Sequence, residues 1–416
     1  MTTFKIYKLR FVSPLHISDH HEDESFSLKT VPSDTFYAAL TSCLAKTGNP
    51  IPDNGDLGFT ISSLFPYYQK EEGEKPVFFL PMPLQAQQMG QIDVTLGKKI
   101  KKVKWVDASL FSELLAGKGY KNNIADIQEA YLTKENLPQD AEGSVEFVKS
   151  EVSQRVTLNS RTGEEDAKPY FVEKIVFKHH SGLYFIAEGE TEMLDKALRL
   201  LSVEGIGTDR NIGFGFFDYT VDQLSLDLPQ DADYQMALSL LIPESEDQLK
   251  QLMDSDKVAY DFMRRGGWIT SYPYNTLRKD AIYAFLPGSV FCKAKGSDCV
   301  PVGKIVNLQP EIGDMTPSKT TLTDYQCVST GCCTHVAKTE ITIDNQHVTK
   351  SLQRYRFISK QPKENTEKIT NLPHFLNLDY LIQVCLSYIS VNVVTFFIQP
   401  AWIVQEPFSE FSLLPS

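Results

Sequence analysis

The sequence predicts an α+β fold in which short strands and amphipathic helices alternate. A strand, a polar loop and a helix follow one another within residues 4–44. Between residues 182 and 222 the order is strand, amphipathic helix, glycine-rich segment and strand. Hydrophobic residues make up 42% and charged residues 23% of the 416 positions, which is close to the globular average, so the chain can form two or three domains with sizeable cores.

Composition excludes several classes of protein. The apolar content excludes wholesale disorder, and 23 Gly with 22 Pro are too few for collagen-like or low-complexity sequence. The net charge of −12 argues against nonspecific coating of nucleic acid, but not against a local basic groove. Seven cysteines do not suit a secreted disulfide scaffold, and the charged start lacks the apolar stretch of a signal peptide. We therefore expect a cytoplasmic protein.

The first 50 residues predict a strand and a helix. Residues 4–12 are rich in aromatic and branched side chains at short period, which is typical of a strand, and Pro14 ends it. Apolar residues recur every four positions in residues 35–44, which predicts a helix with one apolar face. Ser33 or Asp34 is the expected N-cap, because either side-chain oxygen can accept a free N–H of the first helical turn.

The middle of the chain predicts short elements around a polar insertion. Residues 76–84 suit a short buried strand interrupted by prolines, and residues 107–115 suit a short helix. The insertion covers residues 117–150. A strand pair is expected at 152–158 and 170–177, joined by a polar loop.

A further strand is expected at residues 182–187, followed by an amphipathic helix capped by Thr191. Residues 218–222 alternate like a strand. Two later segments, 233–242 and 281–291, also suit strands.

The segment 205–217 is the most informative part of the sequence. It contains two Gly-apolar-Gly units, built on Gly205, Gly207, Gly213 and Gly215. Glycine permits positive φ and close approach of another chain, and exposed backbone N–H groups can bind an anion. Between the units stand Thr208, Asp209, Arg210 and Asn211. A Rossmann or P-loop is excluded by the order of elements, since those loops follow a strand and open a helix.

This arrangement resembles the glycine-rich loop of the RAMP superfamily of CRISPR RNA-binding proteins, which follows a helix and whose pattern the two units match in full. Four other segments resemble the Csm4-type, Cas5-group subunit of a type III-A CRISPR effector and follow the same order. They are residues 6–17, 33–40, 155–163 with 182–185, and 280–291. The chain departs from the family pattern around Arg161, and residues 311–416 match nothing in it.

The resemblance implies two ferredoxin-like (RRM-like) βαββαβ modules with an inserted hairpin and a C-terminal extension. The expected division is 1–87 for the N-terminal part of the first module, 88–160 for the inserted hairpin and loop region, 161–222 for the remainder of the first module, 223–310 for the second module and 311–416 for the extension.

The resemblance also implies a function. The protein would be a non-catalytic subunit that binds the 5′ repeat-derived tag of the guide crRNA, anchors the large polymerase-like subunit and contacts the backbone RAMP subunit, in RNA-guided antiviral defence. No cofactor, metal or membrane is implied. The residues expected to bind RNA are His16, Arg155, Arg161, Gly205, Gly207, Thr208, Arg210, Asn211, Gly213 and Gly215. A bulky side chain at Gly207 or Gly213 is expected to block the path of the RNA backbone.

The alternative function is a metal-independent crRNA-processing endoribonuclease. Histidine can exchange protons near neutral pH, and His16, His20 and His21 lie in the loop after the first strand, where related processing nucleases carry a catalytic histidine. The other interpretation is that His16 supports the turn while the other two lie in a solvated acidic loop. No Gly-Gly-Asp-Asp motif of a polymerase-like subunit occurs, which favours a binding role.

Three further sequence patterns can each be interpreted as functional or as merely structural. Lysines 98, 99, 101, 102 and 104 form the densest basic run, which suits either phosphate contacts or a solvated surface. Cys327, Cys332, Cys333 and His335 lack the paired spacing of a zinc site, so coincidental clustering is expected. Residues 380–405 carry no charge, but polar residues within them favour buried strands over a membrane span.

Overall fold

The architecture comes from a computed structural model. It describes residues 1–18, 25–52, 54–84, 99–115, 126–157, 168–229, 232–269, 277–293, 303–308, 326–328 and 333–336. All of these residues belong to one unit, Met1–Pro362.

The first 226 residues hold most of the regular structure. In chain order the elements are β1 (Thr2–Phe11), α1 (Ser33–Lys46), β2 (Phe59–Ile61), β3 (Phe65–Tyr68), β4 (Val77–Pro81), β5 (Trp105–Asp107), α4 (Ala108–Leu115), β6 (Ile127–Gln128), β7 (Tyr131–Leu132), β8 (Val148–Thr157), β9 (Lys168–Phe177), β10 (Gly182–Gly189), α5 (Thr191–Glu204), the 3-10 turn η3 (Arg210–Ile212) and β11 (Phe217–Leu226).

The elements that follow are shorter. They are β12 (Tyr234–Ala237), α6 (Glu246–Leu252), β13 (Phe262–Arg265), β14 (Ile282–Phe285), β15 (Val290–Cys292), β16 (Ile305–Asn307), β17 (Gln326–Val328) and β18 (Cys333–Val336).

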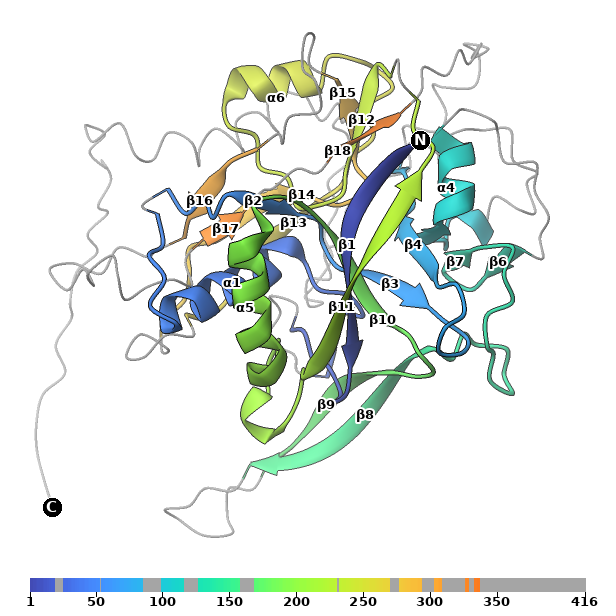
Figure 1. Cartoon of the computed structure of the whole chain (residues 1–416), viewed down its shortest axis with the longest axis vertical. Coiled ribbons are helices and arrows are strands. Elements are labelled where there is room, and N and C mark those ends of the chain that lie inside the picture. Colours follow the sequence, from blue (N-terminus) through green and yellow to red (C-terminus); the bar gives the residue numbers. More distant parts are fainter. Residues whose placement is uncertain are drawn as a thin grey trace, which may run out of the picture. The chain divides into compact units, whose positions relative to one another are not determined.

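A nine-stranded sheet organises the first part of the chain (Figure 1). Its order is β11-β1-β10-β3-β4-β5-β7-β6, and β2 also pairs with β10. Every neighbouring pair is antiparallel except β5 and β7. The N-terminal strand β1 is therefore an interior strand, with β10 on one side and the edge strand β11 along its full length on the other. β8 and β9 form a separate two-stranded hairpin.

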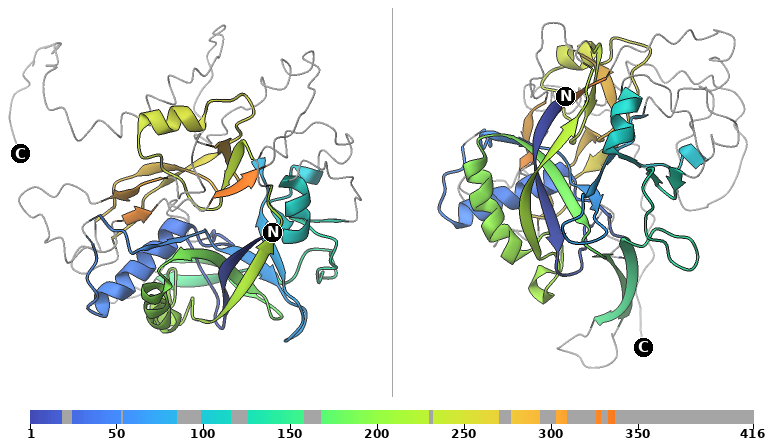
Figure 2. Two further views of the ribbon diagram at one scale, coloured as in Figure 1. Left: turned by 45° about the horizontal axis from the view of Figure 1, so that its top comes forward. Right: turned by 45° about the vertical axis from the view of Figure 1, so that its right-hand side comes forward.

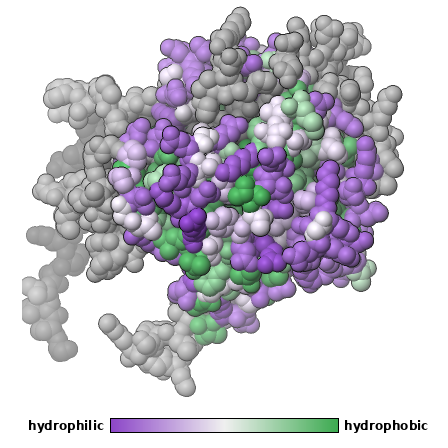
Figure 3. All heavy atoms as spheres, viewed as in Figure 1, coloured by the Kyte–Doolittle hydropathy of each residue, from purple (hydrophilic) through white to green (hydrophobic). Residues whose placement is uncertain are grey.

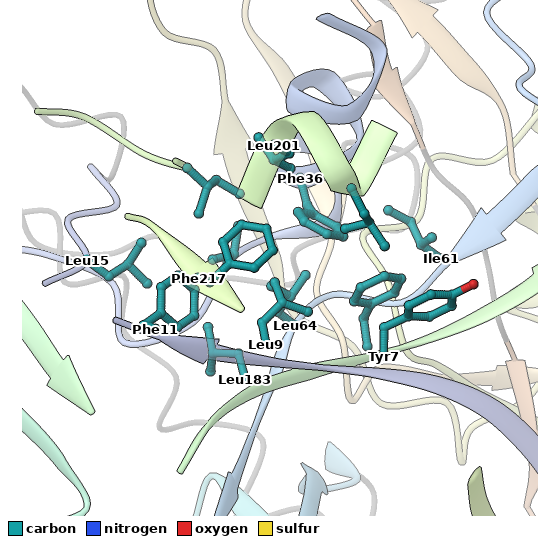
Figure 4. Packing of buried hydrophobic residues seen from close by; sticks show 14 of the residues in the cluster. Tyr7, Leu9, Phe11, Leu15, Phe36, Ile61, Leu64, Leu183, Leu201 and Phe217 are labelled. Carbon is teal, nitrogen blue, oxygen red and sulfur yellow. The ribbon is translucent and has the colours of Figure 1, made fainter. Parts of the chain in front are cut away.

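Helices α1 and α5 cover one face of this sheet, side by side (Figure 2). Alternate residues of β1 point to that face, as the period of a strand requires. Tyr7, Leu9 and Phe11 are buried there against both helices. Figure 4 shows that the same cluster extends to Phe217 of β11 and to Leu15 in the turn after β1. The core therefore reaches the chain segment that adjoins the glycine-rich loop.

The opposite face of the sheet has its own core. Phe4 and Ile6 of β1 pack there with Phe111 of α4 and Met236 of β12. Strands β12, β15 and β18 form a three-stranded sheet, while β13 pairs with β14 and β16 with β17. β17 and β18 lie beyond residue 310, so the strand pairing of the C-terminal half continues past that position.

A buried ion pair joins the N-terminus of α1 to β13. The Arg265 guanidinium donates to both carboxylate oxygens of Asp34, at 2.7 and 3.1 Å, and to the Thr35 hydroxyl at 2.8 Å. The side chains of Arg265 and Asp34 are only 6% and 11% exposed. The carbonyl of Leu238 also accepts a hydrogen bond from the Ser63 N–H at 2.9 Å.

The structure confirms the strands near residues 4–12, 76–84, 152–158, 170–177 and 182–187 as β1, β4, β8, β9 and β10. It also confirms the three helices expected at 35–44, 107–115 and after residue 190, which are α1, α4 and α5. The strand at 218–222 lies within β11.

Both helix caps were predicted wrongly. α1 follows Pro32 and α5 follows Glu190, and neither has a side-chain cap. The Ser33 hydroxyl instead accepts the Leu240 N–H, and Asp34 binds Arg265. The hydroxyl of Thr191 accepts a hydrogen bond from Lys5. The side-chain oxygens expected to cap the helices therefore bind residues that are distant in the sequence.

The two later strands were predicted too long. The segment 281–291 contains two strands, β14 and β15, because the turn between them holds Pro287, which lacks an N–H, and Gly288 at φ +95°. Within 233–242 only β12 is a strand. Beyond it the chain changes partners, since Leu241 bridges to Phe285 of β14.

Within the residues that the structure describes, no helix is both long and apolar enough to cross a membrane. The uncharged segment 380–405 lies outside the described residues.

Candidate nucleic-acid interface

Three chain segments meet at one end of the sheet: the turn after β1, the glycine-rich loop between α5 and β11, and the β8–β9 hairpin. The Thr208 N–H donates to the His16 carbonyl at 3.1 Å, and the Gly215 N–H donates to the Pro14 carbonyl at 2.8 Å. Leu15 exchanges two backbone hydrogen bonds with Ile175 of β9, at 2.8 and 2.7 Å. The β1–β11 ladder, which ends at Phe11 and Phe217, brings the first two segments together.

The glycine-rich loop (residues 205–216) is closed on itself and against the turn. The Ile206 N–H donates to the Gly215 carbonyl at 3.0 Å. All four predicted glycines have positive φ, between +77° and +99°. A Cβ at Gly215 would lie 2.0 Å from the carbonyl oxygen of Ile206, and one at Gly207 would lie 2.2 Å from that of His16. The loop therefore needs glycine at both positions to fold.

The expectation that Gly207 leaves room for RNA is wrong, because its missing Cβ faces the protein backbone. Gly205 is packed in the same way, with the Phe214 carbonyl 2.6 Å from the position of a Cβ. Gly213 differs. Among the described residues, no atom lies within 4 Å of the position its Cβ would take. Of the two glycines proposed for close approach of RNA, only Gly213 presents an open side.

Arg155 of β8 reaches the loop from the hairpin. Its guanidinium donates to the Asp209 carboxylate at 2.6 Å and lies 5.4 Å from the centre of the Phe214 ring. Partial burial alone would lower the pKa of Arg155, but its interactions with Asp209 and, to a smaller extent, with Tyr170 together outweigh burial and raise the pKa above its ordinary value. Arg155 is therefore a fixed cation, and its charge is balanced within the loop.

Arg210 is the loop's second cation. It begins η3, and its side chain forms no hydrogen bond or ion pair with any residue that the structure describes. Thr208 and Asn211 are exposed on either side of it. Asp209 adopts φ +60°, an unusual conformation for a residue with a Cβ, and its carbonyl accepts the N–H groups of Ile212 and Phe214. The charges of Arg155, Asp209 and Arg210 sum to +1.

His16 is 1% exposed. Its ring Nδ1 contacts the carbonyl of Glu173, and since a carbonyl only accepts, Nδ1 is the donor. The Glu173 carboxylate in turn accepts hydrogen bonds from Ser27 and Ser150. His16 thus supports the junction of turn and hairpin from within.

One feature of the hairpin, on the face opposite to Arg155, escaped the sequence analysis. Val152, Val156 and Phe171 on β8 and β9 are each more than half exposed. The register of the hairpin puts all three on one face, because residues 152, 154 and 156 lie opposite 173, 171 and 169. Figure 3 shows hydrophobic residues at the hairpin, at the lower end of that view. The signal was the recurrence of valine at positions 148, 152 and 156, a spacing that puts all three on one face of a strand.

Other predicted candidates are placed less completely. Arg161, His20 and His21 lie outside the described residues, as does Cys332. Cys327 lies on β17, whereas Cys333 and His335 lie on β18, in a different sheet. Among the described residues, no group of three or more His, Cys, Asp or Glu is arranged to hold a metal ion.

Comparison with known sequences gives two family matches. Residues 8–218, more than half of the chain, match the RAMP superfamily. Residues 230–317 match the CRISPR Csm4 C-terminal domain. The first match ends just after the glycine-rich loop and the start of β11, so it contains all three segments of the interface.

Two curated relatives carry the name CRISPR system Cms protein Csm4. The one from Streptococcus thermophilus is 25% identical over 317 residues, which cover 74% of this chain and 93% of the relative. The one from Thermococcus onnurineus is 27% identical over 224 residues, which cover 51% of this chain and 64% of the relative, slightly less than two thirds of its length.

The fold is similar to that of a chain in the crystal structure of a Csm3–Csm4 subcomplex of the type III-A CRISPR-Cas interference complex. The TM-score is 0.52 at 17% sequence identity, and the match covers 81% of this chain and all of the other. This likeness extends over both the sheet-rich first part and the smaller sheets that follow.

Proposed function

Because this chain belongs to the RAMP superfamily and has a Csm4-type C-terminal domain, we propose that it is a non-catalytic, RNA-binding subunit of a type III-A CRISPR effector. It binds the 5′ repeat-derived tag of the guide crRNA at the glycine-rich loop. It anchors the large polymerase-like subunit and contacts the backbone RAMP subunit, and so serves RNA-guided antiviral defence.

The main observation behind the proposal is Arg210, the cation of the glycine-rich loop that has no acidic partner among the described residues. Two cations of β1 have an acidic partner on β11: Lys8 pairs with Asp222 and Arg10 with Asp218, both at 2.9 Å. Arg210 has no such partner among the described residues. A free cation on a closed loop is suited to a phosphate, since no ion pair has to break first.

The loop is also suited to binding without rearrangement. Gly207 and Gly215 fix its path against neighbouring backbone, so little conformational entropy is lost when RNA binds. The open side of Gly213 lets a sugar-phosphate chain come close. The exposed Phe171 on the adjoining hairpin offers a ring on which a base can stack. Backbone contacts of this kind position an RNA and do not read its sequence.

The comparisons support one of the two proposed protein partners. The solved structure with the same fold is a subcomplex of Csm3 with Csm4, which supports a backbone RAMP subunit as neighbour. The large subunit as a further partner is proposed from the family resemblance.

The burial of His16 argues against it as the catalytic residue of the alternative function, a processing endoribonuclease; His20 and His21 lie outside the described residues. A catalytic histidine must reach the RNA, whereas the ring of His16 is buried and its Nδ1 proton is held by the Glu173 carbonyl. Cys43 is no better placed as a nucleophile, because burial raises the pKa of its thiol to about 11.

Replacing Arg210 by alanine is expected to weaken guide-RNA binding without changing sequence preference. The slope of log affinity against log salt should fall by about 0.7, which is the loss of one single-strand phosphate contact. The measurement is RNA binding by fluorescence anisotropy at several salt concentrations. Arg264→Ala is the matched control, because Arg264 is an exposed arginine on β13 that also lacks a described ion-pair partner. Equal slopes for both variants and the parent would contradict the proposal.

Replacing Asp209 by asparagine is expected to strengthen binding. Asparagine tolerates the left-handed conformation of residue 209 but carries no charge, so Arg155 is released to bind a second phosphate. The salt slope should rise by about 0.7. In an Arg155→Ala background the same substitution should leave the slope unchanged, since the released cation is gone. A rise in both backgrounds would show that Asp209 acts without Arg155.

A further inference from the structure

A short turn before β5 concentrates four lysines on the surface. In residues 99–104 (the lysine turn), Ile100 and Val103 are 3% and 1% exposed and pack into the core beneath α4. The four remaining residues are all lysines, and all are exposed. The two buried side chains therefore anchor the turn, and the lysines stand out from it.

Backbone hydrogen bonds hold this turn in place. The N–H groups of Lys102 and Val103 donate to the carbonyls of Lys99 and Ile100, each at 3.0 Å. Lys104 is tied on both sides, since its N–H donates to Ala130 and its carbonyl accepts from Met82, both at 2.8 Å. The lysines project from a fixed base.

The charge of the turn is not compensated within the part of the chain that the structure describes. Among the described residues, none of the four lysine side chains has an ion-pair or hydrogen-bond partner. Two acids, on β5 and α4, are engaged elsewhere. Asp107 is buried and accepts from Ser109 and Thr133, and Glu113 lies 3.7 Å from Lys134. Four like charges in six residues repel one another, which costs stability until an anion binds.

The turn is separate from the glycine-rich loop. β5, which the lysine turn precedes, lies five strands from β11, which the loop precedes. At about 4.8 Å per strand, that is about 24 Å across the sheet. The five intervening pairs are all antiparallel, so β5 and β11 begin at opposite ends of the sheet. Figures 1 and 2 agree, since α4 and the end of α5 that leads into the loop lie far apart in every view.

We propose that the lysine turn is a second binding site for a single-stranded RNA backbone, distant from the glycine-rich loop. This inference rests on the proposed function, because it extends the path of the RNA. Lysine is the residue type that neutralises phosphates as a point charge without reading bases. Protein–protein interfaces are instead depleted in lysine and enriched in aromatic residues and arginine, and the exposed part of the turn has neither. An RNA strand that spans the sheet touches both sites.

The test compares two double variants of the full-length chain that remove the same charge. Lys101→Gln with Lys102→Gln alters the turn. Lys70→Gln with Lys75→Gln removes two exposed lysines from the acidic β3–β4 connection. The probe is a fluorescent oligouridylate of about 30 nucleotides, long enough to reach both sites. For the first variant the slope of log affinity against log salt should fall by about 1.4. Raising the salt from about 50 to about 200 mM should therefore weaken its RNA binding by about sevenfold less than it weakens binding by the parent. The control should match the parent.

Two further measurements separate the possible failures. In an Arg210→Ala background the effect of the lysine variant should add, because distant contacts are independent. If Arg210→Ala lowers the slope and the lysine variant does not, the second site is overturned while the proposed function stands. If neither lowers it, both fail. If the lysine variant binds RNA like the parent but no longer co-purifies with the large subunit, the turn contacts protein, and the inference is overturned. The lysine variant should melt no lower than the parent, because both altered side chains are exposed and their removal relieves repulsion between like charges.

Discussion

Alanine at position 215 will destabilise the first part of the chain by about 3–4 kcal/mol, which lowers the melting temperature by about 10 °C. Two costs add. Alanine resists the φ of +77°, and its Cβ would lie 2.0 Å from the oxygen and 2.8 Å from the nitrogen of Ile206. Both are backbone atoms inside a hydrogen-bonded loop, so relief requires the loop to open. Thermal unfolding of the free chain measures the effect.

Gly213→Ala is the matched control. Its φ of +99° imposes the same kind of backbone strain, but no described atom lies within 4 Å of its Cβ position, so about 1–2 kcal/mol is expected. The difference between the two variants isolates the steric contact from the conformational cost. Equal melting temperatures would show that the loop does not close as described.

Arg265→Met is expected to cost about 3–5 kcal/mol. The substitution keeps a long apolar side chain but leaves the Asp34 carboxylate buried without its counter-ion. Removing one partner of a buried ion pair is costly because the charge that remains is buried without compensation. The Thr35 hydroxyl loses a donor as well. Because the pair links α1 to β13, urea unfolding followed by fluorescence should show a lower midpoint for the whole described unit.

A second substitution tests that explanation. Adding Asp34→Leu to Arg265→Met removes the unpaired carboxylate charge of residue 34. At least half of the lost stability should be recovered, since apolar residues often replace a buried ion pair at little cost. If the double variant is as unstable as the sum of the two single variants, packing and not charge is responsible.

Periodic patterns allowed much of the first half of the fold to be predicted. The alternation in β1 and the four-residue stripe of α1 depend on burial of one face, so they are visible in a short window of sequence. The caps at Ser33 and Thr191 failed for the opposite reason. Their hydroxyls bond to Leu240 and Lys5, more than 180 residues away, and no local pattern records such a partner.

In the candidate site, too, the local pattern could be predicted from the sequence and the long-range contacts could not. The spacing of the glycines predicted a loop, and the loop is there with the expected helix before it and strand after it. Its electrostatics were not predictable, since Arg155 and Asp209 are 54 positions apart and meet only because the hairpin folds back on the turn. His16 also depends on a distant contact, with Glu173, and its burial could not be inferred from a turn without periodicity.

The interior position of β1, between β10 and β11, has a consequence for synthesis of the protein. β1 leaves the ribosome before both of its neighbours, β10 and β11, which lie between residues 182 and 226. At about 5–20 residues per second, it waits about 10–45 s for the second of them. During that time Ile6, Tyr7 and Leu9, which are fully buried in the finished sheet, belong to a nascent strand with two open edges. A chain that stops short of residue 226 therefore presents an aggregation-prone N-terminus, and translation through β11 sets the earliest moment at which the sheet can close.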